Sequence, residues 1–177
     1  GLDTSSAGAK SGSVTLNYAS DGTGTSGLSA IAAGSQSINV TGNVYRLASA
    51  NTLGAVSFGN VHVGDTVQQA LNISNTAVND GFSESLNAGF GSNTGAATNN
   101  GGTVNLLAAG GSISNMTVGL DTSSAGAKTG SVDINYVSDG TGTSGLAAIA
   151  AGSQTVDVSG NVYRLASANT LGAVSFG

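Results

Sequence analysis

The sequence contains no cysteine, no proline and no tryptophan, and it has a single histidine among its 177 residues. Without cysteine there can be no disulfide, no zinc–thiolate site and no thiol nucleophile. Because His62 is the one histidine and Glu84 the one glutamate, most acid–base and metal-hydrolase sites lack the residues they need. The composition therefore argues against an enzyme.

Charged residues are also scarce, at 7% of the chain, and acidic residues outnumber basic ones by nine to four. The resulting net charge of −5 argues against binding to nucleic acid or to an anionic membrane surface, since both need basic patches. No apolar run approaches the roughly 20 residues that span a bilayer, and the first residues lack the regions of a signal peptide. We expect no nucleic-acid partner and no membrane span in this segment.

A repeat dominates the residues that are present, because residues 1–59 return as residues 119–177 with a constant offset of 118. Most of the differences exchange residues of similar shape or polarity. The nine differing pairs are Ser11/Thr129, Thr15/Asp133, Leu16/Ile134, Ala19/Val137, Ser29/Ala147, Ser37/Thr155, Ile38/Val156, Asn39/Asp157 and Thr41/Ser159. A period of 118 residues is too long for one coil of a solenoid, about 20–50 residues, and suits an autonomous domain.

The repeat divides the chain into three parts. Residues 1–48 correspond to the C-terminal part of one unit, residues 49–166 to a complete unit, and residues 167–177 to the linker and first strand of a next unit. A half unit would expose an apolar face and open strand edges, and both features favour association. We therefore expect a longer tandem array, or a chain whose halves are completed by neighbours.

Short strands with one solvated face are predicted within each period. Residues 130–137 alternate apolar Val132, Ile134 and Tyr136 with polar neighbours, and a period of two is typical of a strand. Further strands are predicted at 55–63, 66–75, 84–90, 103–107, 112–120 and 153–164. About seven strands, separated by Gly- and Asn-rich turns, predict an all-β fold, an antiparallel Ig-like β-sandwich.

The core of a unit is expected between the apolar strand faces. Four aromatic residues are expected to add to it: Phe58, Phe82, Phe90 and Tyr136. One helical turn is expected at residues 146–151, where Leu146 and Ile149 would close one end of the sandwich. A 118-residue unit is long enough to remove roughly two-thirds of its unfolded surface from water.

Residues 55–66 contain several positions with a structural signal. Phe58 lies on the apolar face of a predicted strand, and Gly59 is predicted to mark a bulge where the chain crosses between the two sheets. Gly64 and Asp65 indicate a turn in which the aspartate binds backbone amides. A metal-ligand role for Asp65 is less well supported, because no second carboxylate lies close in the sequence.

The run Val56–Ala77, VSFGNVHVGDTVQQALNISNTA, resembles the opening of the choice-of-anchor D repeats of bacterial surface proteins, relatives of the Hydin and major-sperm-protein-like Ig domains. Its F-G-x-V-x-V-G-[DE] element is followed by a strand that ends in Asn75-Thr76, and Leu106–Leu146 resembles the rest of such a unit. Many relatives carry an Asn-Asp-Pro turn where this chain has Ser138–Gly142, so loop details are not transferred. The resemblance implies an extracellular β-sandwich module with structural or adhesive duty and no catalytic residues.

Two repeated tyrosine–arginine pairs, Tyr45-Arg46 and Tyr163-Arg164, stand at the end of the last strand of a unit. Arginine at such a position can pair with a carboxylate or stack on an aromatic ring. We expect these residues, with the linker at 49–54, to form the joint between units.

The loop Asp21–Thr25, repeated as Asp139–Thr143, offers oxygen atoms to calcium but matches neither an EF-hand nor the nonapeptide of calcium β-rolls. We interpret it as a glycine-rich turn and predict no cofactor, with calcium as the alternative. Lys10 or Lys128, together with Glu84, suggests an isopeptide crosslink, but a lysine at a strand edge is ordinarily a solvated charge.

Two functions are compatible with these features. In the first, tandem Ig-like units form a stalk, fibre or filament of a secreted or surface-anchored bacterial protein, and the partners are other copies of the repeat, in cis and in trans. In the second, the chain is an adhesin module whose loops bind a glycan or a surface. Sugar-binding sites usually display aromatic platforms, whereas this chain has no tryptophan and four tyrosines at two repeated positions. We rank the structural role first.

Overall fold

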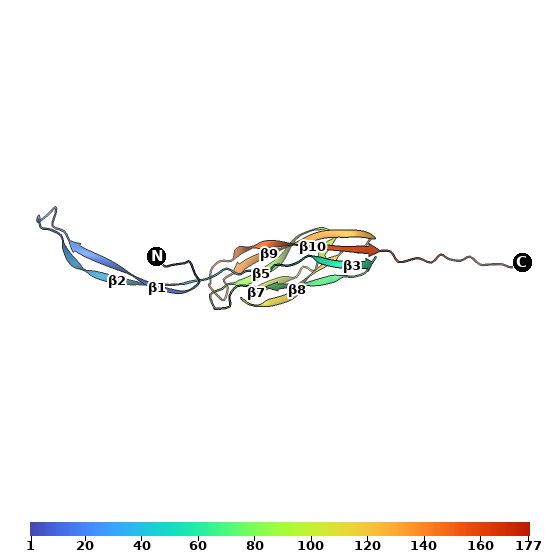
Figure 1. The fold of residues 1–177 in the computed structure, drawn as a ribbon, viewed down its shortest axis with the longest axis horizontal. Helices are drawn as coiled ribbons and strands as arrows, with labels where there is room; N and C mark the ends of the chain where they lie inside the picture. The colour runs from blue at the N-terminus through green and yellow to red at the C-terminus, as the bar shows by residue number, and fades with distance from the viewer.

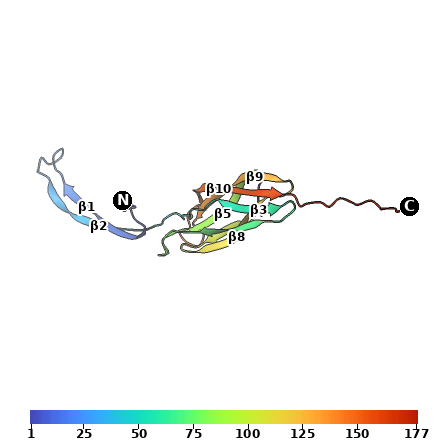
Figure 2. The same ribbon diagram turned by 45° about the vertical axis from the view of Figure 1, so that its right-hand side comes forward.

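The structure is a computed structural model that describes all 177 residues. It contains ten strands and no helix, and hence none that could cross a membrane. The strands are β1 (Gly8–Ser20), β2 (Ile31–Val44), β3 (Val56–His62), β4 (Gln68–Ser74), β5 (Ser85–Gly95), β6 (Ala97–Asn99), β7 (Thr103–Leu107), β8 (Ser112–Leu120), β9 (Gly126–Asp139) and β10 (Ile149–Tyr163). The β1–β2 hairpin stands off one end of a body formed by the other strands, and the C-terminal residues extend from the opposite end (Figures 1 and 2).

The strands β3 to β10 form a sandwich of two sheets. One sheet has the order β3-β10-β9-β5-β7, and the other has the order β4-β8-β6. The predicted all-β, Ig-like sandwich is confirmed. The structure adds the short strand β6, and one neighbouring pair, β3 and β10, is parallel rather than antiparallel.

The core lies between the two sheets and uses the predicted apolar strand faces. The pair β9 and β10 supplies several of its most buried side chains: Val132, Ile134, Tyr136, Val156 and Val158. Phe58 and Phe90 pack against this core from partly buried positions. The expectation for Phe82 is wrong, because its ring lies 5.6 Å from that of Tyr45 and outside the core cluster.

The helical turn expected at 146–151 is also absent. Leu146 lies in a loop, Ile149 begins β10, and both side chains are more than half exposed, at 63% and 51%. Ile149 pairs with Ser138 of β9, so the antiparallel ladder prevails over the helical propensity of this alanine-rich run.

Gly59 lies at a bulge in β3. Ser57 pairs with Ser159 and Asn60 with Asn161, so β3 has one extra residue between these pairs. The φ angle of Gly59 is +64°, a left-handed conformation that favours glycine. The predicted crossing between sheets is wrong, because β3 continues to pair with β10 on both sides of the bulge.

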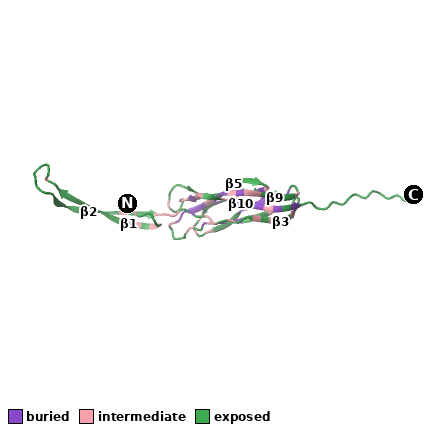
Figure 3. Ribbon diagram, turned by 45° about the horizontal axis from the view of Figure 1, so that its top comes forward, coloured by how far each residue is buried: buried purple, intermediate pink, exposed green.

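The β1–β2 hairpin has almost the same sequence as β9 and β10 but stands outside the sandwich. Its strands pair only with each other, from Gly8 opposite Val44 to Ser20 opposite Ile31. Figure 3 shows the hairpin as almost wholly exposed, with the buried residues gathered in the sandwich.

Candidate functional site

The segment that joins β2 to β3 begins at one end of the sandwich, continues along its side, and is the candidate functional site. We call residues 45–55 the joint segment. Arg46 forms a parallel bridge with Ser83, and Ala50 forms an antiparallel bridge with Asn75. The Arg46 N–H donates to the Phe82 carbonyl at 2.8 Å, and the Arg46 carbonyl accepts the Glu84 N–H at 3.0 Å. The joint segment is therefore part of the hydrogen-bonded structure of the unit.

The side chains of Tyr45 and Arg46 contact the turn before β5. Arg46 Nη1 lies 2.7 Å from Asp80 Oδ2, and both side chains are partly exposed. This hydrogen bond, followed by one from the Phe82 N–H, lowers the pKa of Asp80. The Tyr45 ring packs at a tilt of 46° against the ring of Phe82. The structure thus brings both predicted joint residues of this copy against the complete unit.

A buried carboxylate ties the joint segment to a distant loop. Glu84 is only 2% exposed, and its two oxygens accept the hydroxyls of Ser138 at 2.6 Å and Ser144 at 2.5 Å. Ser138 Oγ in turn accepts the Ala48 N–H at 2.8 Å, and the Ala48 side chain is part of the core. These contacts hold β9, the loop after it and the joint segment together.

Asn75, from the motif at residues 56–77, is buried near Glu84 and uses all of its side-chain hydrogen-bonding groups. Its amide nitrogen donates to the carbonyls of Glu84 at 3.0 Å and Leu107 at 3.1 Å. Its oxygen accepts the N–H groups of Ser49 and Ala77, each at 3.2 Å. Asn75 therefore links four chain segments at the joint, which is a structural role.

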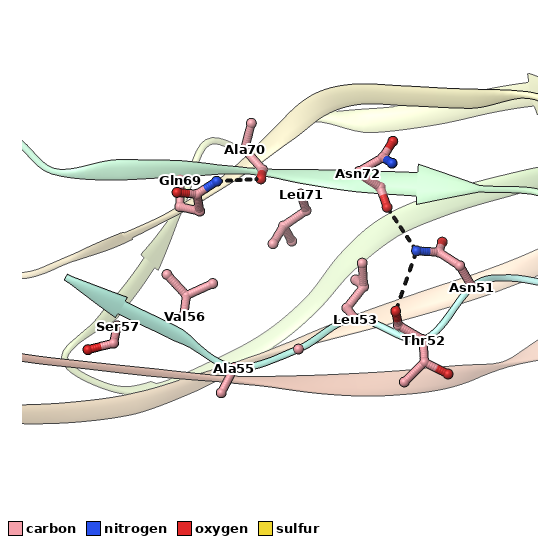
Figure 4. A pocket seen from close by; sticks show the side chains of 11 residues that line it. Asn51, Thr52, Leu53, Ala55, Val56, Ser57, Gln69, Ala70, Leu71 and Asn72 are labelled. Carbon is pink, nitrogen blue, oxygen red and sulfur yellow. Dashed lines mark hydrogen bonds between the residues drawn. The ribbon is translucent and has the colours of Figure 1, made fainter.

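The rest of the joint segment is held by β10 and β4. Gln154 accepts the Leu53 N–H at 2.9 Å and donates to the Asn51 carbonyl at 2.6 Å. Asn51 Nδ2 donates to the Asn72 carbonyl at 3.0 Å, as Figure 4 shows. The linker predicted to contact the neighbouring unit is thus fixed along one side of the sandwich.

A pocket of about 440 Å³ lies between the joint segment with β3 and the facing strand β4 (Figure 4). Its lining residues are Asn51, Thr52, Leu53, Gly54, Ala55, Val56, Ser57, Gln69, Ala70, Leu71 and Asn72. None of them is aromatic or charged. The pocket therefore offers neither a stacking surface for a sugar nor a catalytic acid or base.

The other motif residues lie at the opposite end of the sandwich. Asp65 Oδ2 accepts the His62 N–H at 2.7 Å, and the Asp65 carbonyl accepts the Thr122 hydroxyl at 2.6 Å. Gly64 beside them has a φ of +88°, which a side chain would strain. This turn carries the aspartate–amide contact that its sequence predicts.

Tyr163 and Arg164 leave the sandwich at this same end. The Tyr163 carbonyl accepts the Val63 N–H at 2.9 Å, but its side chain is 53% exposed. Arg164 forms no ion pair. The structure therefore distinguishes the two predicted joint pairs: the side chains of Tyr45 and Arg46 make a ring contact and an ion pair, whereas those of Tyr163 and Arg164 make neither.

The glycine-rich loops form closed turns. Asp139 Oδ1 accepts the Thr141 N–H, and Asp21 Oδ1 accepts the Thr23 N–H, each at 2.9 Å. The pKa of the Asp139 carboxyl is lowered first by the Thr141 N–H, and that of Asp21 first by the Thr23 hydroxyl and then by the Thr23 N–H. The structure contains no group of three or more His, Asp or Glu side chains that could hold a metal ion.

The lysines lie apart from the buried carboxylate. Lys128 Nζ donates to Ser124 Oγ at 2.7 Å, and Lys10 makes the equivalent bond to Ser6 at the same distance. Both bonds are exposed, so neither lysine is placed to form a crosslink beside Glu84.

No protein-family model matches the chain, and no curated protein matches it. Among solved structures, the chain is similar to the ASH / PapD-like domain of human CEP192, PapD-like domain 7. The match has a TM-score of 0.46 and 10% sequence identity, and it covers 67% of this chain and 87% of that chain.

Proposed function

We propose that the chain is a structural tandem-repeat module of a secreted or cell-surface bacterial protein, in which Ig-like units pack end to end into a stalk, fibre or filament. The partners in this proposal are other copies of the repeat, in cis and in trans. The observation that carries it is the joint segment, which is paired to the sandwich by its backbone rather than left as a free linker.

The joint segment has the contacts expected of a stiff connection. Relative motion is the usual expectation for domains joined by a linker, but it requires a linker with few contacts. Here the backbone N–H of Thr76 donates to the Ser49 carbonyl at 2.6 Å, and the backbone N–H of Asn51 donates to the Ser74 carbonyl at 3.1 Å. Ala48 is in the core, and Arg46 is ion-paired. Bending at this point would break backbone hydrogen bonds and expose apolar surface.

Electron microscopy of an array of several units tests the proposal. If successive units repeat the contacts of the joint segment, the array will form rods with narrow inter-unit angles. Broad, random angles would contradict a stiff stalk. The competing role as an adhesin predicts instead that the same array binds one class of glycan on a glycan array, and the lining of the pocket gives no support for that outcome.

A further inference from the structure

The β1–β2 hairpin exposes an apolar face that its repeat buries. We call Val14, Leu16, Tyr18, Ile38 and Val40 the hairpin face. The first four side chains are 42% to 47% exposed, whereas their counterparts in β9 and β10 are 2% exposed or less. Figure 3 shows the contrast between the hairpin and the sandwich. Such a contiguous exposed apolar face in a soluble protein marks an interaction site.

The sequence differences between the two copies leave the hairpin face apolar. Two of the nine substitutions fall at positions that are buried in β9 and β10, and both exchange aliphatic residues: Leu16 for Ile134 and Ile38 for Val156. Six fall on the outward face of these strands and one in the loop between them. Among the outward differences, Thr15 and Asn39 of the hairpin stand where the β9–β10 copy has the carboxylates Asp133 and Asp157. The two copies therefore share the apolar character of their inward surface and differ mainly on their outward surface.

The strand edges of the hairpin are also unpaired. In the sandwich, β5 pairs with the outer edge of β9 and β3 pairs with the outer edge of β10. The equivalent edges of β1 and β2 have no neighbouring strand. Open edges of this length, 13 and 14 residues, are templates for further strand pairing.

We propose that the hairpin face binds a further set of six strands equivalent to β3–β8, a segment with the sequence type of residues 56–118, and so completes a second sandwich. This inference rests on the proposed tandem function. The chain itself shows the partner, because its own residues 56–118 cover the same face of β9 and β10. A second copy of the chain does not suffice, since each copy has two such hairpins and one set of β3–β8, which β9 and β10 occupy.

The repeat offset fixes the register of this complex. Phe90 of β5 lies opposite Ile134, so the equivalent phenylalanine of the partner lies opposite Leu16. Val56 of β3 lies opposite Val158 in parallel register, so the equivalent valine of the partner lies beside Val40.

One side chain changes its bonding when the hairpin is covered. In the free hairpin, Gln36 accepts the Tyr18 hydroxyl at 2.9 Å. Its counterpart Gln154 is bonded to the joint segment instead, and the Tyr136 hydroxyl is buried without a partner. Docking therefore transfers Gln36 from Tyr18 to the joint segment of the incoming unit.

The test is to fuse a second copy of residues 49–118 before Gly1 and to measure hydrogen–deuterium exchange. The two hairpins give peptides of different mass because of their substitutions, so each is followed separately. In the chain without the extension, β1 and β2 exchange much faster than β9 and β10. In the extended chain, we expect their exchange to slow to within about tenfold of β9 and β10.

Two adjacent substitutions in the extended chain provide a matched control. Leu16→Asp places a carboxylate on the hairpin face and should abolish the new protection, while Thr15→Asp places one on the outward face, as in the β9 copy, and should leave it. The unit at 49–166 is the internal reference for folding.

Rapid exchange of β1 and β2 in the extended chain, with β9 and β10 still protected, would overturn the proposal. The proposal would also be overturned if β1 and β2 were protected in the unextended chain and sedimentation showed a dimer, because a second copy of the chain would then cover the hairpin face. Flexible rods with a protected hairpin would contradict the stiff array but not this binding.

Discussion

Residues 8–44 and residues 126–162 have nearly identical sequences but lie in different environments. As β9 and β10, the sequence is covered on one face by β3–β8, and its inward side chains are buried; as β1 and β2, it is open on both faces and both edges. The local geometry is nevertheless the same. Gly34 and Gly152 have φ angles of +101° and +97°, and the two glycine-rich turns close with equal backbone distances, 2.8 Å from Gly27 to Gly22 and from Gly145 to Gly140. Turns and bulges are thus set within about ten residues, whereas burial depends on strands elsewhere in the chain.

The largest effect is expected from one substitution made in each copy. Val132→Asp puts an unpaired carboxylate at a fully buried position and should cost about 4 kcal/mol or more, enough to unfold a marginal unit. Val14→Asp, at the same place in the exposed hairpin, should stay within about 0.5 kcal/mol. Thermal denaturation followed by circular dichroism measures both. Equal losses would show that the hairpin face is covered in solution.

A smaller effect is expected from Glu84→Ala, because the hydroxyls of Ser138 and Ser144 lose their shared acceptor. Losing a charge-assisted hydrogen bond and leaving buried groups unsatisfied should destabilise the unit by about 3 kcal/mol in urea denaturation. The turn at Asp139–Gly145 should then exchange its amides as fast as the turn at Asp21–Gly27, which has no such carboxylate. An unchanged amide exchange rate at residues 139–145 would show that Glu84 does not stabilise that turn.

The sequence predicts the strands where its pattern is strong. The strand expected at 112–120 is β8 with the same bounds, and its second half alternates apolar Met116, Val118 and Leu120 with Thr117 and Gly119. β6 has only three residues, too few to show a period of two. The run at 146–151 has a local helical pattern, but its pairing with β9 is decided by tertiary structure.

The candidate site was only half predictable for the same reason. Tyr45 and Arg46 could be proposed as joint residues from their place after a strand, but their partners Asp80 and Phe82 lie more than 30 residues further on, with Arg46 and Asp80 separated by 34. No local pattern marks Glu84 as buried, since its hydroxyl partners are 54 and 60 residues away. The scarcity of acidic residues was the one available signal, because residues 60–118 contain only three.

Comparison of the two arginines sharpens the contrast at the joint. Arg46→Ala removes the bond to Asp80 and should broaden the range of hairpin orientations, while Arg164→Ala, which breaks no ion pair, should leave it unchanged. Because the chain has no cysteine, spin labels at Thr41→Cys and Asn105→Cys report the distance between hairpin and sandwich. If the parent chain and both arginine variants give equally narrow distance distributions, the backbone pairing of the joint segment alone holds the hairpin in place.

The smallest effect concerns a charge that one copy has and the other lacks. The hydroxyl of Ser92, and next that of Thr155, donates to Asp133 and lowers the pKa of its carboxyl below 3.8. A lowered pKa in the folded state stabilises the unit above pH 3.8 and loses this contribution as the pH falls through the folded value. Asp133→Thr, which installs the residue of position 15, should therefore reduce the melting temperature slightly at neutral pH and not at pH 2. Thr15→Asp should leave the pH dependence of the melting temperature of the sandwich unchanged, since the hairpin has no counterpart of Ser92 beside it. If the melting temperature of Asp133→Thr instead differs from that of the parent chain by the same amount at every pH, the substitution acts through packing rather than charge.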